Sequence, residues 1–435
     1  MANHGNNLCN TDVLRVESLP EADKIMILPG QPQVSFQQFG GYVTVDEQED
    51  RALFYYFAEA ETDPSSKPLV LWLNEGPGCS SIGVGAFCEH GPFKPTEHVL
   101  VKNDYSWNKG VGFSYSANKS FYASVTDDMT AQDNLVFLEH WFNKFPEYKN
   151  RDFYITGVML VCIISIRHYG PQLAQLIIQS KMKFNLKGIA LRNPLLEFST
   201  DFNSRAEYLW SHGLISDATY ELFTNSQTDT LTPICSGVNN PVSREIGKFI
   251  DKYDVTLDVC SSFRWFTSTD TKNIDVCVED ETVTYLNRED VQKAFHAWLV
   301  GVTAWSVYST VLHYEKKNLE IPTIHVLGSL VKSGIRVLVF SGDEDSVIPL
   351  LGTCTLVNEL AKELELKTTV PYRVWFEGRQ VTGWTQVYGD ILSFATIRGA
   401  AHEAPFSQPE RLLVLFNSFL GGNPPPEAVL STESI

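Results

Sequence analysis

A strand-like apolar run that breaks into a glycine-rich turn lies between Lys67 and Phe93. The run has the composition of a buried strand, and the turn after it contains Gly76, Pro77, Gly78, Gly83 and Gly85. Because glycine lets the backbone approach a ligand and direct N–H groups toward it, the segment is typical of an active-site loop. The alternative is a tight surface turn, which does not need this much glycine beside Glu89 and Asn74.

Eight motifs follow one another along the chain in an order that carries a family resemblance. In chain order they are FQQFGGYVTV, WLNEGPGCSS, GAFCEHGPF, FNSRAEYLWSHGLIS, YLNREDVQKAFHAWLVG, SGDEDSVIPL, PYRVWFEGRQVTGWTQVYG and RGAAHEAPFSQPERLLVLF. From about Leu19 to the C-terminus the sequence resembles the serine carboxypeptidases, most closely the plant serine carboxypeptidase-like group, which usually has WLNGGPGCSS at the second motif.

The resemblance implies an α/β-hydrolase fold, in which a central, mostly parallel sheet is flanked by helices and carries an inserted cap. The core is expected at residues 20–200 and 282–425, the cap at 201–281, and an unstructured N-terminal segment at 1–19. Residues 203–281 are expected to be irregular. Local patterns predict an antiparallel pair at 42–44 and 53–57, a core-facing helix at 129–145 and buried strands at 187–192, 335–340 and 394–397.

A core strand is expected to be missing after Lys109. The family has roughly ten further residues there, an apolar strand of the central sheet, before the sequence GVGFSYS that resumes here at Gly110. Loss of a core strand is a serious packing defect.

Two members of a catalytic triad match the family position by position. Asp345 follows the strand at 335–340 within SGDEDSVIPL, and His402 follows the strand at 394–397 within RGAAHEAPF. The order Asp then His in the C-terminal third is the hydrolase order. For Asp345, the competing interpretation is a solvated turn carboxylate.

The nucleophile is absent. The family reads FYITGESYAGHYVPQLA where this chain reads FYITGVMLVCIISIRHYGPQLA, and no two glycines of the chain are four residues apart, as G-x-S-x-G requires. Anchored on Gly157, the alignment places the family's Glu, Ser and Tyr on Val158, Met159 and Leu160; anchored on His168, it places the serine on Ile164. Ser165 and Cys162 lie in a β-branched apolar run, so residues 158–166 are expected to extend a buried strand.

The resemblance also assigns the binding groups. Gly76 is the surviving oxyanion candidate, and Asn74 and Glu89 match residues that bind the substrate's terminal carboxylate. The second acid of that subsite has become Val158. Glu75 replaces a glycine and is expected to repel the carboxylate at a cost of roughly a kcal/mol or more. Arg192 stands where the family keeps glycine, and is expected to disrupt the packing rather than to serve a function.

The chain has eight cysteines, and one of the family's three disulfides keeps both partners, Cys260 and Cys277. Cys79 would pair with a position now occupied by Tyr308, and Cys235 with one that has become Gln227, so two bridges are expected to be lost. The remaining thiols, Cys9, Cys88, Cys162 and Cys354, have no assigned partner.

A net charge of −18 argues against nucleic acid or an anionic membrane as a partner, because both repel an acidic surface. No window is apolar enough to span a membrane. The family is secretory, which implies secretion or a vacuolar location, whereas residues 1–20 lack the pattern of a signal peptide. Asn118 begins a glycosylation sequon. The resemblance implies no metal or cofactor, and a peptide C-terminus as substrate.

These observations predict a serine carboxypeptidase-family protein that is inactive or severely impaired as written, since release of C-terminal residues proceeds through an acyl-enzyme on the missing serine. Three alternatives remain open: an ordinary enzyme whose sequence is altered by a faulty gene model after Lys109 and Gly157, a non-catalytic relative that binds peptides or a partner, and an acyltransferase, which needs the same serine.

Overall fold

The computed structural model describes residues 20–75, 78–96, 99–106, 113–118, 120–159, 169–180, 182–225, 233–260, 274–309, 311–313 and 321–427. Its strands are β1 (Lys24–Ile25), β2 (Gln38–Asp46), β3 (Arg51–Ala58), β4 (Leu69–Glu75), β5 (Phe93–Thr96), β6 (Val99–Lys102), β7 (Tyr115–Ser116), β8 (Phe153–Met159), β9 (Leu186–Arg192), β10 (Arg336–Gly342), β11 (Thr368–Glu377), β12 (Gln380–Tyr388) and β13 (Leu392–Ile397).

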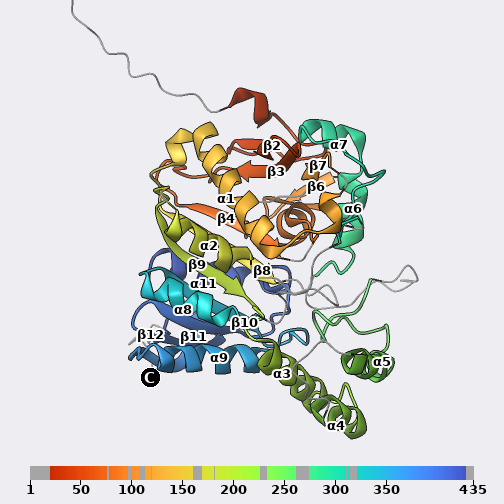
Figure 1. The fold of residues 1–435 in the computed structure, drawn as a ribbon, viewed down its shortest axis with the longest axis vertical. Coiled ribbons are helices and arrows are strands. Elements are labelled where there is room, and N and C mark those ends of the chain that lie inside the picture. The colour runs from red at the N-terminus through yellow and green to blue at the C-terminus, as the bar shows by residue number, and fades with distance from the viewer. Residues whose placement is uncertain are drawn as a thin grey trace, which may run out of the picture.

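The helices alternate with these strands through much of the chain (Figure 1). They are α1 (Asp127–Lys144), α2 (Tyr169–Gln179), α3 (Phe198–Ser211), α4 (Asp217–Asn225), α5 (Pro233–Ile246), α6 (Val278–Leu286), α7 (Glu289–Ala294), α8 (Ile324–Lys332), α9 (Leu350–Glu363), α10 (Ala404–Ser407) and α11 (Pro409–Leu420). Short 3-10 turns occur at η1 (Glu21–Asp23), η3 (Phe121–Ala123) and η4 (Pro146–Tyr148), and η2 (Ser81–Glu89) is a π-helical segment.

The central sheet has the order β11-β12-β13-β10-β9-β8-β4. Its neighbouring strands β4, β8, β9, β10 and β13 pair in parallel. Strands β12 and β11 extend the sheet beyond β13 by antiparallel pairing. This is the mostly parallel α/β sheet that the sequence predicts. Parallel strands read as continuous apolar runs because helices cover both of their faces.

Alternate residues of each central strand enter different layers of the core. In β10, Val337 and Val339 pack into the layer formed with α1, α2, α8 and α9, whereas Leu338 and Phe340 pack into the layer formed with α11. This alternation follows from the two-residue period of a strand. The helix predicted at 129–145 is α1, and its apolar side chains belong to the first layer.

The predicted antiparallel pair is β2 and β3, in which Tyr42 lies opposite Phe54 and Val43 opposite Leu53. These strands do not join the central sheet. They form a separate sheet with the order β1-β2-β3-β7, and β3 pairs with β7 only at Arg51 and Ala52. Among the described residues, the remaining outer edge of β3 and the outer edge of β4 therefore have no strand partner.

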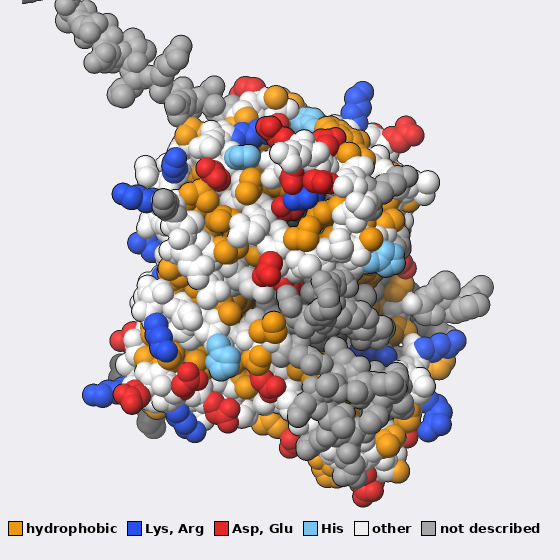
Figure 2. Space-filling model, viewed as in Figure 1, with side chains coloured by type: hydrophobic (Ala, Val, Ile, Leu, Met, Phe, Trp, Pro, Cys, Tyr) orange, Lys and Arg blue, Asp and Glu red, His pale blue; other side chains and the backbone are white. Residues whose placement is uncertain are grey.

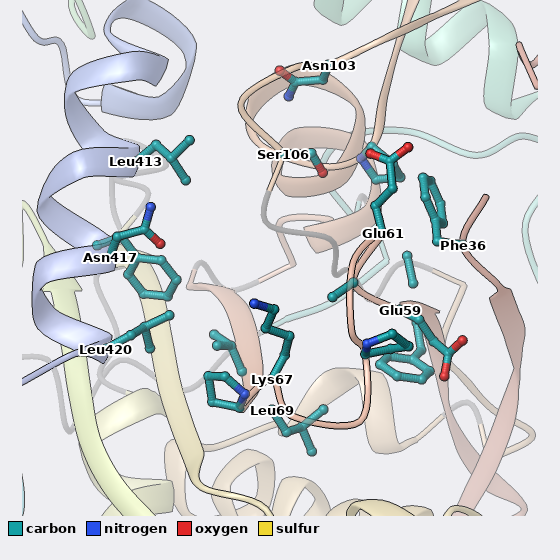
Figure 3. A pocket seen from close by; sticks show the side chains of 18 of the residues that line it. Phe36, Glu59, Glu61, Lys67, Leu69, Asn103, Ser106, Leu413, Asn417 and Leu420 are labelled. Carbon is teal, nitrogen blue, oxygen red and sulfur yellow. The ribbon is translucent and has the colours of Figure 1, made fainter. Parts of the chain in front are cut away.

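A cavity separates these two edges. It has a volume of about 50 Å³ and is lined by residues 55–57 of β3, residues 69–72 of β4 and apolar side chains of α1. A larger cavity of about 320 Å³ continues at the amino end of β4, where Lys67 points into the space between α11 and Glu61 (Figure 3). A sheet that is divided between β3 and β4 is what the predicted absence of a core strand leads us to expect.

The prediction that residues 203–281 are irregular was wrong for most of the described part of that range. It contains most of α3, all of α4 and α5 and the first turn of α6, whereas residues 247–260 and 274–277 form no helix or strand. Ala206 and Leu209 lie on one face of α3 and pack with Phe223 of α4 and Val242 of α5 in a small apolar cluster of their own. Helices α3, α4 and α5 lie beyond one end of the sheet (Figure 1). The boundaries of the core and the cap stay a prediction.

The cysteine positions agree with the sequence analysis where they are described. Cys260 and Cys277 form a disulfide bond. Cys79 and Tyr308 lie opposite each other in an isolated antiparallel bridge, flanked by the hydrogen bonds Ser309 N to Gly78 O (2.8 Å) and Ser80 N to Val307 O (2.9 Å). Cys88 is buried and Cys354 half-buried, both as thiols, whereas Cys9 and Cys162 lie outside the described residues. The side chain of Cys235 and all of Gln227 also lie outside them.

We expect an inserted strand to stabilise the protein. Seven apolar, β-branched residues placed between Lys109 and Gly110 would pair with both open edges and bury several side chains, so the free energy of unfolding should rise by at least about 2 kcal/mol after the cost of ordering the segment. Urea unfolding measures this change. The m-value of the insertion variant should also exceed that of the original protein, because the variant exposes more surface on unfolding. A Gly/Ser insertion of equal length is the control; equal stability of the two insertions would contradict the prediction.

We also expect Tyr308→Cys to restore a disulfide with Cys79. The flanking hydrogen bonds make these residues a non-hydrogen-bonded antiparallel pair, whose Cα atoms are about 4.5 Å apart, within the range of a disulfide. Under the same oxidising conditions, the free energy of unfolding of this variant should exceed that of Tyr308→Ser by about 2–4 kcal/mol. Tyr308→Ser serves as the control for the lost ring, and peptide mapping of the alkylated, non-reduced variant that finds Cys79 as a free thiol would refute the prediction.

Candidate active site

Asp345 and His402, which lie far apart in the sequence, meet at the carboxyl edge of the sheet. Asp345 follows β10 and His402 follows β13, and these two strands are parallel neighbours. His402 Nδ1 lies 2.7 Å from Asp345 Oδ2, and both side chains are fully buried. A carboxylate only accepts hydrogen bonds, so it favours the tautomer with the proton on Nδ1 and the lone pair on Nε2, the nitrogen that a general base uses.

The carboxylate of Asp345 is fixed by its own turn. Its Oδ1 accepts hydrogen bonds from the backbone N–H groups of Val347 (2.7 Å) and Ile348 (3.2 Å). With Oδ2 occupied by the imidazole, both oxygens have partners, as a buried carboxylate requires. The competing interpretation of Asp345 as a solvated turn residue is therefore wrong.

Asn193 ties together the ends of three central strands, and sequence reasoning missed it. It follows β9, its Oδ1 accepts from Gly342 N at the end of β10 (2.9 Å), and its Nδ2 donates to His402 O (3.0 Å) beyond β13. Its backbone has φ +43°, a region that asparagine tolerates better than most residues. The available signal was an asparagine directly after a buried strand and before Pro194.

Asn74 is the penultimate residue of β4 and is buried against η2. Its Oδ1 accepts from Trp72 Nε1 (2.6 Å), its backbone N–H donates to Ser81 Oγ (2.8 Å), and its Nδ2 is buried without a hydrogen-bond partner. The amide nitrogen is therefore a buried hydrogen-bond donor that the protein itself leaves unused.

The glycines of η2 serve packing rather than ligand approach. A Cβ atom on Gly85 would lie 2.7 Å from both Asn74 Oδ1 and Trp72 Nε1, and one on Gly83 would lie 2.4 Å from the ring of Trp305. Both distances are too short for real carbon contacts, so the interpretation of these two glycines as ligand-facing was wrong. Gly76, the oxyanion candidate, lies outside the described residues, as does the side chain of Glu75.

Glu89, the last residue of η2, is bound by Arg192 at the end of β9. The guanidinium donates from Nη1 to Oε2 (3.0 Å) and from Nη2 to Oε1 (2.8 Å), and both side chains are fully buried. A charged pair in such a place is tolerated only with this bidentate geometry. The prediction that Arg192 disrupts the packing was wrong, because Glu89 neutralises it.

The pair sets the ionisation of Glu89. Burial alone would raise the pKa of this carboxyl, but the charge of Arg192 and the hydrogen bonds from His90 and Arg192 outweigh burial and lower the pKa below its ordinary value. Near it, burial raises the pKa of Glu403 well above its ordinary value, and the charge of Glu89 adds to that effect.

Comparison with known proteins gives the family. The family model "Serine carboxypeptidase" matches residues 29–422. Among curated proteins, Serine carboxypeptidase-like 45 of Arabidopsis thaliana is 59% identical and Serine carboxypeptidase-like 46 is 58% identical, each alignment covering 94% of both chains.

The chain belongs to the serine carboxypeptidase family. Among solved structures, the prohormone-processing carboxypeptidase Kex1 of Saccharomyces cerevisiae superposes with a TM-score of 0.73 at 20% identity, covering 92% of this chain and 97% of Kex1, which shows the shared α/β-hydrolase fold.

The structure thus brings together four of the residues that the family resemblance singles out, in two separate contacts. Asp345 and His402 form one, and Glu89 and Arg192 the other, while Asn74 lies on the same rung of the sheet as Arg192. Residues 160–168, which include Cys162, Ser165 and Ile164, lie outside the described residues, so the predicted extension of the strand to residue 166 is described only to Met159.

On the face shown in Figure 2, acidic and basic side chains are interspersed. Within the described parts of the chain, no three His, Cys, Asp or Glu side chains gather in a way that could hold a metal ion, and none of the helices is both long and apolar enough to cross a membrane.

We expect Glu89→Gln to destabilise the protein strongly at neutral pH and weakly in acid. The folded pKa of Glu89 lies below its ordinary value of 4.5, so the stability from ionised Glu89 is present above about pH 4.5 and is lost as the pH falls through the folded pKa. Breaking such a buried pair costs about 3–5 kcal/mol.

Urea unfolding of both proteins between pH 3 and pH 8 measures this difference. Glu61→Gln is the matched control, because Glu61 pairs with Lys102 at the surface and should change stability little at any pH. A Glu89→Gln effect that does not shrink toward pH 3 would show that ionised Glu89 does not stabilise the fold.

Proposed function

We propose that this protein receives the C-terminal end of a peptide at the carboxyl edge of its sheet and that, as written, it hydrolyses peptides very weakly or not at all. The observation that carries the proposal is a hydrogen-bonded Asp345–His402 couple in a chain whose sequence has no G-x-S-x-G elbow. Peptides are the substrate class that membership in a carboxypeptidase family implies.

Each residue has a role in the proposed site. In an intact member, Asp345 orients His402 and stabilises its positive charge, His402 takes the proton of the serine, and backbone N–H groups, including that of Gly76, bind the oxyanion. In such an intact member, Asn74 and Glu89 are also the candidates for contact with the terminal carboxylate of the substrate. No metal or cofactor enters this scheme.

The missing serine sets the size of the defect. Removal of a triad nucleophile lowers kcat by about six orders of magnitude, because transfer of the acyl group has no acceptor in the enzyme. An acyltransferase would need the same acyl-enzyme, so the loss applies to it equally. A non-catalytic relative that binds peptides or a partner is the second candidate, and the retained Asp345–His402 couple without a nucleophile is the observation that favours it.

We further propose that the protein matures in the secretory route, toward secretion or the vacuole. The Cys260–Cys277 disulfide supports an oxidising compartment. The sequon residue Asn118 donates its side-chain amide to Glu49, and this hydrogen bond must break for a glycan to be attached there.

We expect a serine-directed phosphonate probe to leave the wild-type protein unlabelled. Intact mass after incubation should show no covalent adduct, and a blocked peptide with a free C-terminus should release no amino acid above background. Labelling of a serine in the wild-type protein would overturn the proposed inactivity.

A variant that restores the elbow provides the positive arm. Replacing the ten residues 158–167 by the five residues Glu-Ser-Tyr-Ala-Gly joins Gly157 to His168 through the family's elbow sequence and places the serine at position 159. This variant should bind the probe and gain peptidase activity, and the same variant with alanine at position 159 is the matched control. A restored elbow without labelling would count against a catalytic role for the Asp345–His402 couple in this chain.

A further inference from the structure

Arg192, Val158 and Asn74 lie on one rung of the central sheet. Val158 of β8 is in register with Arg192 of β9 on one side and with Asn74 of β4 on the other. Level positions of neighbouring parallel strands project from the same face of the sheet. The guanidinium therefore enters the same region as the Asn74 amide, beside the position where the family's second acid has been replaced by Val158.

The guanidinium uses both oxygens of Glu89. Its two terminal nitrogens donate to the two oxygens at 3.0 and 2.8 Å, and its centre lies 5.8 Å from the ring centre of Trp72, the side chain that also binds Asn74. Both members of the ion pair have no exposed surface. Because both oxygens of Glu89 already accept hydrogen bonds from Arg192, neither of them is directed toward a ligand.

The charge of Glu89 also opposes binding of a ligand carboxylate. A carboxyl group can bind a second carboxylate only if one of the two carries a proton, since two ionised carboxylates repel each other. The pKa of Glu89 is lowered in spite of burial, chiefly by the charge of Arg192, so Glu89 has no proton to share over most of the pH range. The other titratable groups around Glu89 are Cys88, His90, Lys94 and Glu403.

We propose that Arg192 is a specificity-determining residue that closes the terminal-carboxylate subsite from within, by holding Glu89 in an internal ion pair. The cleft then does not distinguish a peptide with a free C-terminal carboxylate from the same peptide with a C-terminal amide. This inference rests on the proposed function, because it concerns the same subsite. The competing role, in which Arg192 itself receives the ligand carboxylate through its unpartnered Nε, predicts a strong preference for the free carboxylate.

The test compares binding of two N-blocked peptides that differ only in a C-terminal carboxylate or amide. Calorimetric titrations at pH 4.5 and pH 8.5 would use the wild-type protein, Arg192→Gly and the double variant Arg192→Gly/Glu89→Gln. The wild-type protein should bind both peptides within twofold at both pH values. Arg192→Gly should prefer the carboxylate at least tenfold at pH 4.5, because Glu89, freed of its cation, is kept protonated by burial.

The double variant separates the charge of Glu89 from the space that Arg192 vacates. Glutamine is a neutral hydrogen-bond donor at every pH. The double variant should therefore still prefer the carboxylate peptide at pH 8.5, whereas the preference of Arg192→Gly should be smaller at that pH. Arg51→Gly is the matched control: Arg51 also forms a bidentate pair, with Asp133 (3.0 and 3.0 Å), away from this rung, and its loss should leave peptide discrimination unchanged.

The outcomes distinguish this inference from the proposed function. A wild-type protein that prefers the carboxylate tenfold overturns the inference and leaves the proposed function standing, as does an Arg192→Gly variant that binds both peptides equally at both pH values. Failure of every variant to bind either peptide at millimolar concentration overturns both. If Arg192→Gly does not fold, Arg192→Gln, which keeps a donor toward Glu89 without the charge, should give the same preference at pH 4.5.

Discussion

The parallel hydrogen-bonded ladder from β4 through β8, β9 and β10 to β13 is the constraint on which the site depends. In a parallel ladder every strand ends at the same edge, so residues that follow different strands become neighbours although long stretches of chain separate them. Asp345 and His402 meet for this reason. Asn193 reinforces the arrangement, since its side chain binds the backbone of the last residue of β10 and that of His402 beyond β13.

Two buried polar couples at this edge behave differently. In the Asp345–His402 couple, both carboxylate oxygens have hydrogen-bond partners, and one of them holds the imidazole through Nδ1. In the Arg192–Glu89 couple, the two charged groups bind each other, and both are fully buried. The chain thus holds the imidazole of His402 in a fixed orientation, whereas the carboxylate of Glu89 is bound by an internal cation.

Sequence patterns predicted those parts of the structure whose signals are local. The central strands are buried on both faces and read as apolar runs, α1 shows its helical period, and Asp345 and His402 could be placed because each directly follows such a strand. The predictions failed where the outcome depends on distant residues. Arg192 looked disruptive because its partner Glu89 is 103 positions away in the sequence. Gly83 and Gly85 looked ligand-facing because the rings of Trp305 and Trp72 that exclude a Cβ atom there are not visible locally. Helices α3, α4 and α5 were missed because their apolar faces cover only a small cluster.

The division between β3 and β4 bears on how the protein behaves among other chains. An unpaired strand edge is a template for any extended segment, and native proteins normally cover such edges or place charges and prolines on them. The open edge of β4 begins at Leu69 and reads Leu-Val-Leu-Trp-Leu, with no charge or proline before Asn74. During synthesis this stretch offers chaperones and proteases a recognisable segment for as long as the sheet is incomplete, so the amount of folded protein in a cell is set by the competition between folding and quality control.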